Sequence, residues 1–435
     1  MNARTTALSA LIACRKQGAW ADGVLKEYIV RDRLDKRDAA LASRLCYGVL
    51  QNRMLLDHDI QCCLTGPMNK LHPITLDILR LGMYQLMLMD KIPVSAAVNE
   101  AVEQGKKYVN KGAAGLINGV LRRAAREKEA LPQPKSLAVR YSHPQALVEL
   151  LAASVGEDQI EALLASHNTW PQTVIQVNPL VSSRQEVQNA LEEAGAHLEA
   201  HPWLSDAWFA SGTGNLEQMP LFRDGGFFVQ DPAARLAVMA AGLEPGMQVL
   251  DCCAAPGGKS FAAAMAMHDR GSIISCDIHP HKIKLLEKGA ERLHISILHP
   301  TLLDGREFQS QWEGKLDAVI ADVPCSGLGV IRKKPDIRYK DLNGLERLPQ
   351  VQQAILENVS RYVRPGGVLI YSTCTILRRE NEDVVRAFLE SHPQFAAEPF
   401  DLPEAFGGNC PGWITLLPSI HETDGFFICK LRRKP

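Results

Sequence analysis

The sequence predicts a protein of several domains: an all-α N-terminal domain, a small α+β module and a C-terminal α/β domain. The chain has 435 residues, more than one ordinary domain needs. Its first part has apolar residues at helical spacing, whereas its last part alternates strand-like apolar runs with helix-compatible segments. We place the domains at residues 1–130, 131–220 and 221–435.

The composition is that of a soluble globular protein, with 46% hydrophobic and 22% charged residues. We find no apolar run of about 18 residues that would span a membrane and no signal-peptide pattern at the N-terminus. The 11 cysteines include no CxxC pair, which argues against a disulfide framework and a zinc site. We therefore expect a cytoplasmic monomer with no metal and no membrane partner.

The N-terminal domain combines helical periodicity with an excess of positive charge. Helical spacing is present in Leu41 to Leu50, Ile74 to Met89 and Ala113 to Ala125, with Pro73 and Pro93 between helices. Residues 1–130 hold about 20 Lys and Arg and about 13 Asp and Glu, so about +7, which leaves about −8 for the rest of a chain of net charge −1. Such a basic module indicates a nucleic-acid surface or simply solvated helices, and charge alone does not decide between them.

The middle of the chain begins with a proline-rich linker, Glu127 to Pro144. A β-rich run, Thr173 to Pro179, then precedes an amphipathic helix, Ser183 to Gly195. From residue 221 on, five apolar runs predict a parallel, doubly wound sheet: MQVLDCC, SIISCDI, HISILHP, LDAVIAD and GGVLIYSTC. Such sheets bind ligands at the carboxyl ends of their strands.

The first of these strands ends in a glycine-rich turn, DCCAAPGGKS. A P-loop would need glycine in place of Cys253, and a dinucleotide fingerprint would need separated glycines. What remains is a tight turn whose N–H groups hold a carboxylate, with a lysine to add charge. The candidate cofactor-binding residues here are Cys253, Ala254, Ala255, Pro256, Gly257, Gly258 and Lys259.

Three further strands end at or near acids, namely Asp277, Asp304 and Asp322. Asp277 is placed to accept hydrogen bonds from ribose hydroxyls, and Asp304 from an adenine amino group. Each acid alone is more simply a helix cap or a loop residue. Together, beside a turn that lacks a phosphate cradle, they predict a pocket for S-adenosylmethionine.

Two cysteines follow strand ends in equivalent places, Cys325 in IADVPCSGLG and Cys374 in YSTCTI. Enzymes that methylate exocyclic amines typically end the Asp322 strand in Asp/Asn-Pro-Pro-Tyr/Phe. A thiol there suits a target that is not nucleophilic, such as carbon 5 of a pyrimidine, because a thiolate added at carbon 6 makes carbon 5 reactive. The alternatives are two small core residues or a redox pair, which the spacing does not support.

At this point the chain resembles the RNA cytosine-5 methyltransferase family. The resemblance rests on DCCAAPGGKS, ADVPCSGLGVIRKKPD, YSTCTI with Glu380-Asn381-Glu382, and DGFFICKLRR. It implies a Rossmann-like class I methyltransferase domain in which Cys374 is the nucleophile and Cys325 assists product release. It also implies that Asp322 hydrogen-bonds the cytosine ring nitrogen and borders the cofactor.

The N-terminal segments LCYGVLQNR and GLINGVLRR resemble the NusB-type RNA-binding domain. That fusion is typical of the bacterial 16S ribosomal RNA subgroup, the RsmB (Sun/Fmu) type, whose target is a cytosine at position 967. The resemblance thus implies 16S ribosomal RNA as partner. The alternatives are the same chemistry on tRNA, or an RNA-binding factor without catalysis.

The chain departs from the family pattern at Cys252, Val323, Thr375 and Ala234, all small residues outside the expected chemistry. The basic residues after the Pro-Cys turn, Arg332, Lys333 and Lys334, are either a clamp on the RNA phosphates around a flipped base or a solvated loop.

Overall fold

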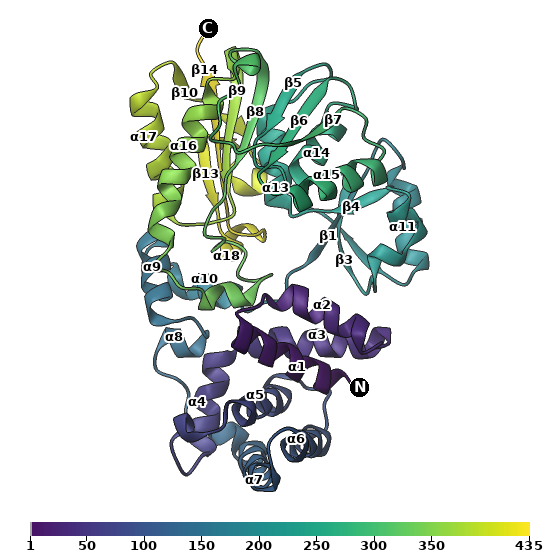
Figure 1. Ribbon diagram of the computed structural model, residues 1–435, viewed down its shortest axis with the longest axis vertical. Coiled ribbons are helices and arrows are strands. Elements are labelled where there is room, and N and C mark those ends of the chain that lie inside the picture. The colour runs from purple at the N-terminus through teal and green to yellow at the C-terminus, as the bar shows by residue number, and fades with distance from the viewer. Residues whose placement is uncertain (1) are drawn as a thin grey trace. The chain divides into compact units, whose positions relative to one another are not determined.

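The structure, a computed structural model, describes residues 2–435, which fall into two compact units (Figure 1). The first comprises Met1–Thr169 together with Ile331–Lys340, and the second comprises Trp170–Val330 with Asp341–Pro435. The first unit is helical, and the second holds a small antiparallel sheet and a large mixed sheet. The predicted fold class is therefore confirmed.

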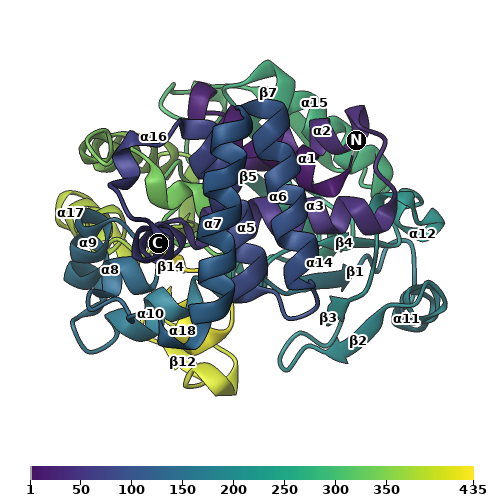
Figure 2. The same ribbon diagram turned by 90° about the horizontal axis from the view of Figure 1, so that it is seen from below.

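The helical unit is built on α1 to α7, of which α5, α6 and α7 lie side by side (Figure 2). Polar caps and prolines begin several helices: the Asn110 side chain accepts from the Ala113 N–H at 2.9 Å, and Pro73 is the first residue of α5. The bounds are α1 (Ala3–Gln17), α2 (Ala21–Arg31), α3 (Lys36–Gln51), α4 (Arg53–Cys63), α5 (Pro73–Leu88), α6 (Val94–Tyr108), α7 (Lys111–Glu127), α8 (Leu137–Arg140), α9 (Gln145–Val155) and α10 (Ile160–Ser166).

Ile331–Lys340, with the short helix η5 (Pro335–Tyr339), belongs to the helical unit although it follows β8 of the other unit in sequence. Arg338 fixes this segment, since its side chain is 1% exposed. Its guanidinium donates to the carbonyl oxygens of Gln51, at 2.7 Å, and His167, and to the Asn168 side chain at 3.0 Å. Burying a guanidinium is costly unless its donors are paired, and these partners pair both Nη atoms of Arg338.

The small sheet has the strand order β2-β3-β1-β4, with antiparallel pairing throughout. A capping box at Ser183 and Glu186 begins the helix that packs on it. The bounds are β1 (Thr173–Val177), α11 (Arg184–Glu193), β2 (His197–Ala200), β3 (Ala207–Ser211), α12 (Pro220–Arg223) and β4 (Phe227–Val229).

The large sheet has the order β10-β14-β9-β8-β5-β6-β7, with β13 also pairing β14. Strands β5 to β9 are parallel, as predicted, whereas β10, β13 and β14 add an antiparallel edge that the sequence analysis did not assign. The bounds are α13 (Pro232–Ala241), β5 (Gln248–Asp251), α14 (Gly258–Ala266), β6 (Ser272–Asp277), α15 (Pro280–Arg292), β7 (Leu298–Leu302), β8 (Leu316–Asp322), α16 (Leu348–Ser360), β9 (Val363–Thr373), α17 (Glu382–Ser391), β10 (Phe395–Ala397), β11 (Phe400–Asp401), β12 (Asn409–Cys410), β13 (Trp413–Leu416), α18 (Pro418–His421) and β14 (Phe426–Arg433).

Alternate residues of the central strands face opposite helical layers. Ile320 and Ile370 pack in the core with α13, α14 and α15, whereas Val319 and Leu369 pack in the core with α16 and α17. Both layers are apolar, which explains why these strands read as continuous apolar runs. The chain proceeds from β5 to β7 on one side and from β8 to β9 on the other, so the switch point lies between β5 and β8.

None of the helices in the described residues has the length and apolar character that a membrane crossing requires. Residues 2–435 also contain no group of three or more His, Cys, Asp or Glu side chains suited to a metal ion.

Candidate active site

The carboxyl ends of β5, β8 and β9 meet at the switch point, because parallel strands end at the same edge. Asp251 pairs with Ile320 in register, and Asp322 pairs with Ser372. The residues that follow these strands therefore share one region: the glycine-rich turn after β5, the Pro-Cys turn after β8 and the Thr-Cys turn after β9.

The two predicted thiols lie together, with Cys325 Sγ at 3.3 Å from Cys374 Sγ. Both side chains are partly exposed, unlike the buried core cysteines such as Cys276 and Cys429. The Gly329 N–H donates to the Cys374 carbonyl oxygen at 3.0 Å, which ties one turn to the other. A hydrogen bond from the Cys325 thiol lowers the pKa of Cys374, and the same bond together with burial raises the pKa of Cys325.

Gly329 allows a very close approach of backbone to backbone at this site. Its carbonyl oxygen accepts from the Gly425 N–H at 2.9 Å. A Cβ atom at position 329 would collide with the Gly425 carbonyl group. Glycine is thus required where the Pro-Cys turn passes the start of β14.

Lys259 points toward Asp322, with Nζ at 2.7 Å from Oδ2. The other carboxylate oxygen of Asp322 accepts from the Ser372 hydroxyl at 2.8 Å. Burial by itself would lower the pKa of Lys259, but the charge of Asp322 and a hydrogen bond to it raise that pKa above its ordinary value. The positive charge of Lys259 also contributes to the lowered pKa of Cys374.

Glu380 is fully buried, and its side chain accepts hydrogen bonds that hold the Pro-Cys turn. Its Oε2 accepts from the Ser326 N–H and from the Gln352 side chain, each at 2.9 Å. Gln352 also donates to the Pro324 carbonyl oxygen at 3.0 Å. The residues on both sides of Cys325 are therefore held through one buried carboxyl group. Sequence reasoning gave Glu380 no role, although it stood in the motif after the second thiol.

A pocket of about 470 Å³ opens at the Pro-Cys turn, where Pro324, the residue before Cys325, is part of its wall. Five of the predicted cofactor residues line it, namely Cys253, Ala255, Asp277, Asp304 and Asp322. The sequence analysis missed its other lining residues, which are Cys252, Ile278, His279, Lys282, Gly305, Arg306, Pro324, Val351 and Ile355. For several of these residues, the one signal in the sequence was a position directly after a predicted strand.

The acids in this pocket are held by local contacts. Asp277 accepts from the His279 N–H at 3.0 Å and lies 3.2 Å from the Lys282 ammonium. Asp304 pairs with Arg306 at 2.6 Å, and hydrogen bonds from Arg306 lower the pKa of Asp304. Ile278 is 52% exposed, so an apolar side chain stands open between polar ones.

Most residues of the glycine-rich turn lie outside the pocket's wall and hold the backbone of the turn in place. The Ala254 N–H donates to the Cys276 carbonyl oxygen at 2.7 Å, and Gly257, at φ 113°, leads into α14, which begins at Gly258. Ala254, Pro256, Gly257, Gly258 and Lys259 are not among the pocket's lining residues. The turn thus contributes Cys253 and Ala255 to the wall, and Lys259 to the thiol side.

Asp251 anchors the turn through a buried chain of hydroxyl groups. The Ser260 hydroxyl donates to Asp251 at 2.7 Å, and Ser275 donates to Ser260 at 2.9 Å. Burial raises the pKa of Asp251 to about 7.

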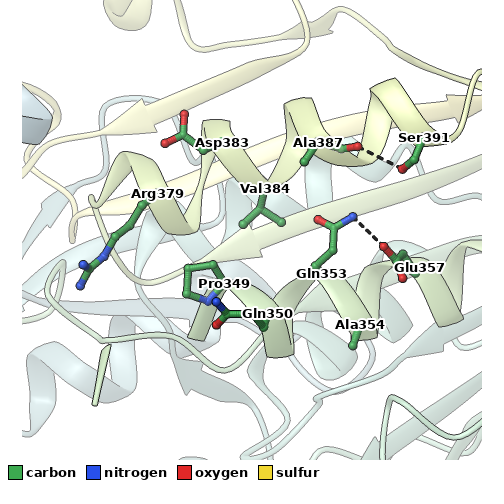
Figure 3. Close-up of a pocket in the computed structure, with 10 residues that line it drawn as sticks. All are labelled: Pro349, Gln350, Gln353, Ala354, Glu357, Arg379, Asp383, Val384, Ala387 and Ser391. Carbon is green, nitrogen blue, oxygen red and sulfur yellow. Dashed lines mark hydrogen bonds between the residues drawn. The ribbon is translucent and has the colours of Figure 1, made fainter. Parts of the chain in front are cut away.

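A second cavity of about 590 Å³ lies between α16 and α17 (Figure 3). Its lining residues include Gln353, Arg379 and Asp383, and none of the predicted site residues. This cavity holds no thiol and no strand-end acid, so we do not assign it to the chemistry.

Three family models match the chain. The NusB family matches residues 1–126, a ferredoxin-like domain of RsmF/B-type methyltransferases matches residues 143–211, and the 16S rRNA methyltransferase RsmB/F family matches residues 238–432. The parallel sheet, its switch-point pocket and these matches define an RNA methyltransferase with an appended NusB-type domain.

The relatives extend over the whole chain. The "Probable ribosomal RNA small subunit methyltransferase B" of Bacillus subtilis (strain 168) is 36% identical, with 99% of this chain and 98% of that protein covered. The "Ribosomal RNA small subunit methyltransferase B" of Vibrio cholerae serotype O1 is 32% identical, with 100% and 98% covered. The chain belongs to this ribosomal RNA small subunit methyltransferase B family.

Solved structures share the fold. The structure described as "Crystal Structure of PH0851" is 26% identical, covers 98% of each chain and has a TM-score of 0.80. "The crystal structure of NSun6 from Pyrococcus horikoshii with SFG" is 21% identical, covers 67% of this chain and 98% of that chain, and has a TM-score of 0.59.

Proposed function

We propose that this chain transfers a methyl group from S-adenosylmethionine to carbon 5 of a cytosine in 16S ribosomal RNA, through a covalent bond between Cys374 Sγ and carbon 6. The observation that carries the proposal is the pair of thiols at 3.3 Å beside a strand-end pocket. Methylation of an amine or hydroxyl group has no use for two thiols at this edge, whereas methylation at carbon 5 needs a nucleophile and a base.

The pocket fits S-adenosylmethionine in size and in polarity. Asp277 at the end of β6 suits the ribose hydroxyls, the exposed face of Ile278 suits an adenine ring, and Asp304 suits its amino group. The bound cofactor supplies an electrophilic methyl group. Asp322 and Pro324 line the pocket next to Cys325, which supports a reacting base that lies beside the bound cofactor.

In the first step Cys374 adds as a thiolate to carbon 6 of cytosine, forming an S–C bond while the ring double bond shifts electron density to carbon 5. The lowered pKa of Cys374 supports this role, because the thiolate is the attacking form. The ring nitrogen donates to Asp322 once it takes up a proton during the addition, and the partner of Asp322, Lys259, supplies positive charge next to the ring as negative charge develops there.

In the second step carbon 5 takes the methyl group, Cys325 removes the carbon-5 proton, and the S–C bond breaks to release Cys374 as a thiolate. The hydrogen bond to Cys374 is the main cause of the raised pKa of Cys325. Once Cys374 is bonded to carbon, that cause disappears while burial still raises the pKa, so the proposal requires Cys325 to give its proton to solvent before it acts as the base. The carbon-5 proton then restores Cys325, so one proton leaves per methyl group.

The substrate assignment rests on the family and on the helical unit. The relatives carry the names of ribosomal RNA small subunit enzymes, and the NusB-type domain carries the excess positive charge. We propose cytosine 967 as the target on the same basis. A tRNA target would leave the chemistry unchanged, and a factor without catalysis would leave the thiol pair without a purpose.

The test is transfer of labelled methyl groups to unmodified 16S ribosomal RNA and to tRNA, followed by nucleoside analysis. We expect label in 5-methylcytidine of the 16S RNA, none in tRNA, and loss of transfer in Cys374→Ala. Cys62→Ala is the matched control, since Cys62 is a partly exposed thiol of the helical unit. Full transfer by Cys374→Ala would refute the mechanism, and label in tRNA alone would refute the substrate.

A further inference from the structure

The helical unit contains a pocket of about 330 Å³ that the proposed chemistry does not use. Helices α1, α3, α4 and α5, the turn before α2 and the Ile331–Lys340 segment supply its walls. The lining residues combine cations with aromatic rings: Leu11, Cys14, Arg15, Gly18, Ala19, Trp20, Val49, Leu50, Arg53, Asp77, Arg80, Asp336, Tyr339 and Lys340. The pocket lies wholly within one compact unit.

Most charges of this pocket are already compensated. Asp77 pairs with Arg15 at 2.8 Å and with Arg80 at 3.3 Å, and Arg80 also pairs with Asp57 at 2.7 Å. Asp336 accepts from the Ala21 N–H at 3.0 Å, at the start of α2. These acids therefore already form ion pairs or hydrogen bonds within the protein.

Arg53 is the exception, because it pairs with no carboxylate in residues 2–435. Its guanidinium carbon lies 3.5 Å from the centre of the Tyr339 ring, a stacked cation–π contact. Burial lowers the pKa of Arg53, and the nearby charges of Asp57 and Asp77 offset this effect only in part. A half-buried guanidinium with free donors facing a pocket is suited to a phosphate group.

Trp20 provides an open ring at the same pocket. It is 52% exposed, and the Lys340 ammonium lies 5.3 Å from its ring centre. An exposed tryptophan beside cations is the usual platform on which an unpaired base stacks.

The pocket is preformed. The Tyr339 hydroxyl donates to the Leu50 carbonyl oxygen at 3.1 Å, and Arg338 anchors the neighbouring backbone. A rigid site loses little conformational entropy when a ligand binds.

We propose that this pocket binds one unstacked nucleotide of the RNA substrate, with its phosphate on Arg53 and its base on Trp20. The proposal rests on the proposed function, since it takes RNA as the substrate. A ring for stacking and a planar cation without a salt bridge in one cavity match a nucleotide better than an acidic peptide, whose carboxylates bring no flat ring to stack. The segment that holds Tyr339 follows the Cys325 turn in the sequence. A nucleotide in this pocket would therefore contact the segment of chain that comes directly after the Pro-Cys turn.

The test measures binding of a fluorescein-labelled, unmodified 16S RNA fragment by anisotropy to the full chain and to Arg53→Ala, Arg53→Lys and Trp20→Ala. Lys111→Ala is the matched control, since it removes one exposed positive charge of the same unit at the start of α7. We expect Kd to rise about tenfold in Arg53→Ala and in Trp20→Ala, and less than twofold in the control. Arg53→Lys should regain part of the loss, because it keeps the charge without the planar fork.

Three further readouts separate this site from the catalytic one. Binding of S-adenosylmethionine and the thermal unfolding temperature should stay unchanged in all variants, and KM for RNA should rise with kcat unchanged. Binding within twofold of the unmutated chain in Arg53→Ala and Trp20→Ala, or an equal loss in Lys111→Ala, would overturn the proposal. Methylation by the unmutated chain is scored separately, so the pocket can fail while the proposed function stands.

Discussion

Glu380→Ala should loosen the turn that carries Cys325. Glu380 is buried, and its Oε2 accepts from the Ser326 N–H and the Gln352 side chain, each at 2.9 Å. Removing the carboxyl group takes away the acceptor of the Ser326 N–H. Gln352 keeps its second bond to the Pro324 carbonyl oxygen at 3.0 Å.

The magnitude follows from these contacts. A buried N–H without a partner costs about 1–3 kcal/mol, and the loss of one hydrogen bond from Gln352 costs about 1 kcal/mol. We therefore expect Glu380→Ala to lower the free energy of unfolding by about 2–4 kcal/mol. Glu380→Gln keeps the side-chain volume and one carbonyl acceptor, so its loss should stay under about 1 kcal/mol.

The assay pairs urea unfolding with single-turnover methylation. Glu380→Ala should displace Cys325 and slow product release, so the protein–RNA adduct should accumulate relative to the unmutated chain. Glu380→Gln is the matched control and should do neither. If Glu380→Ala keeps both its stability and its release rate, the carboxyl group does not hold the turn.

Three other outcomes follow from the site. The rate of methyl transfer should rise with pH with a midpoint below 9.0, the ordinary thiol value, and Lys259→Met should move that midpoint upward, as a pH–rate profile would record. Burial raises the pKa of Asp251 to about 7 from 3.8, so its protonated form stabilises the fold below about pH 4, and this stability is lost as the pH rises through 7. Urea unfolding at several pH values should show this decline in the free energy of unfolding, and Asp251→Asn should abolish the decline. Gly329→Ala should lower the unfolding free energy by at least about 1 kcal/mol, because its Cβ would collide with the Gly425 carbonyl group, and an unchanged urea midpoint would contradict the close approach.

The parallel core of the large sheet could be predicted because its strands are buried on both faces and read as apolar runs. The antiparallel edge was missed, because β14 (Phe426–Arg433) was seen only as a motif, and a motif does not state which strand it pairs with. The placement of Ile331–Lys340 in the helical unit was also not predictable. It depends on the burial of Arg338, and a lone arginine in a basic loop gives no sign of being buried.

The thiols could be predicted as partners because both follow parallel strands, whose carboxyl ends meet. The residues that support the thiol site could not be predicted. Ser372 lies within β9 and reads as an ordinary strand residue, yet it donates to Asp322. Lys259 was expected to add charge beside a bound carboxylate, and the sequence did not indicate that its ammonium pairs with Asp322 at the end of β8.

The most direct test of the central proposal is to map the protein–RNA adduct. Cys325→Ala, incubated with S-adenosylmethionine and unmodified 16S ribosomal RNA, is digested with nuclease and trypsin and examined by mass spectrometry. We predict a methylated cytidine attached to the peptide that contains Cys374. Attachment to another cysteine, or methylated product at the unmutated rate without any adduct, would contradict the mechanism.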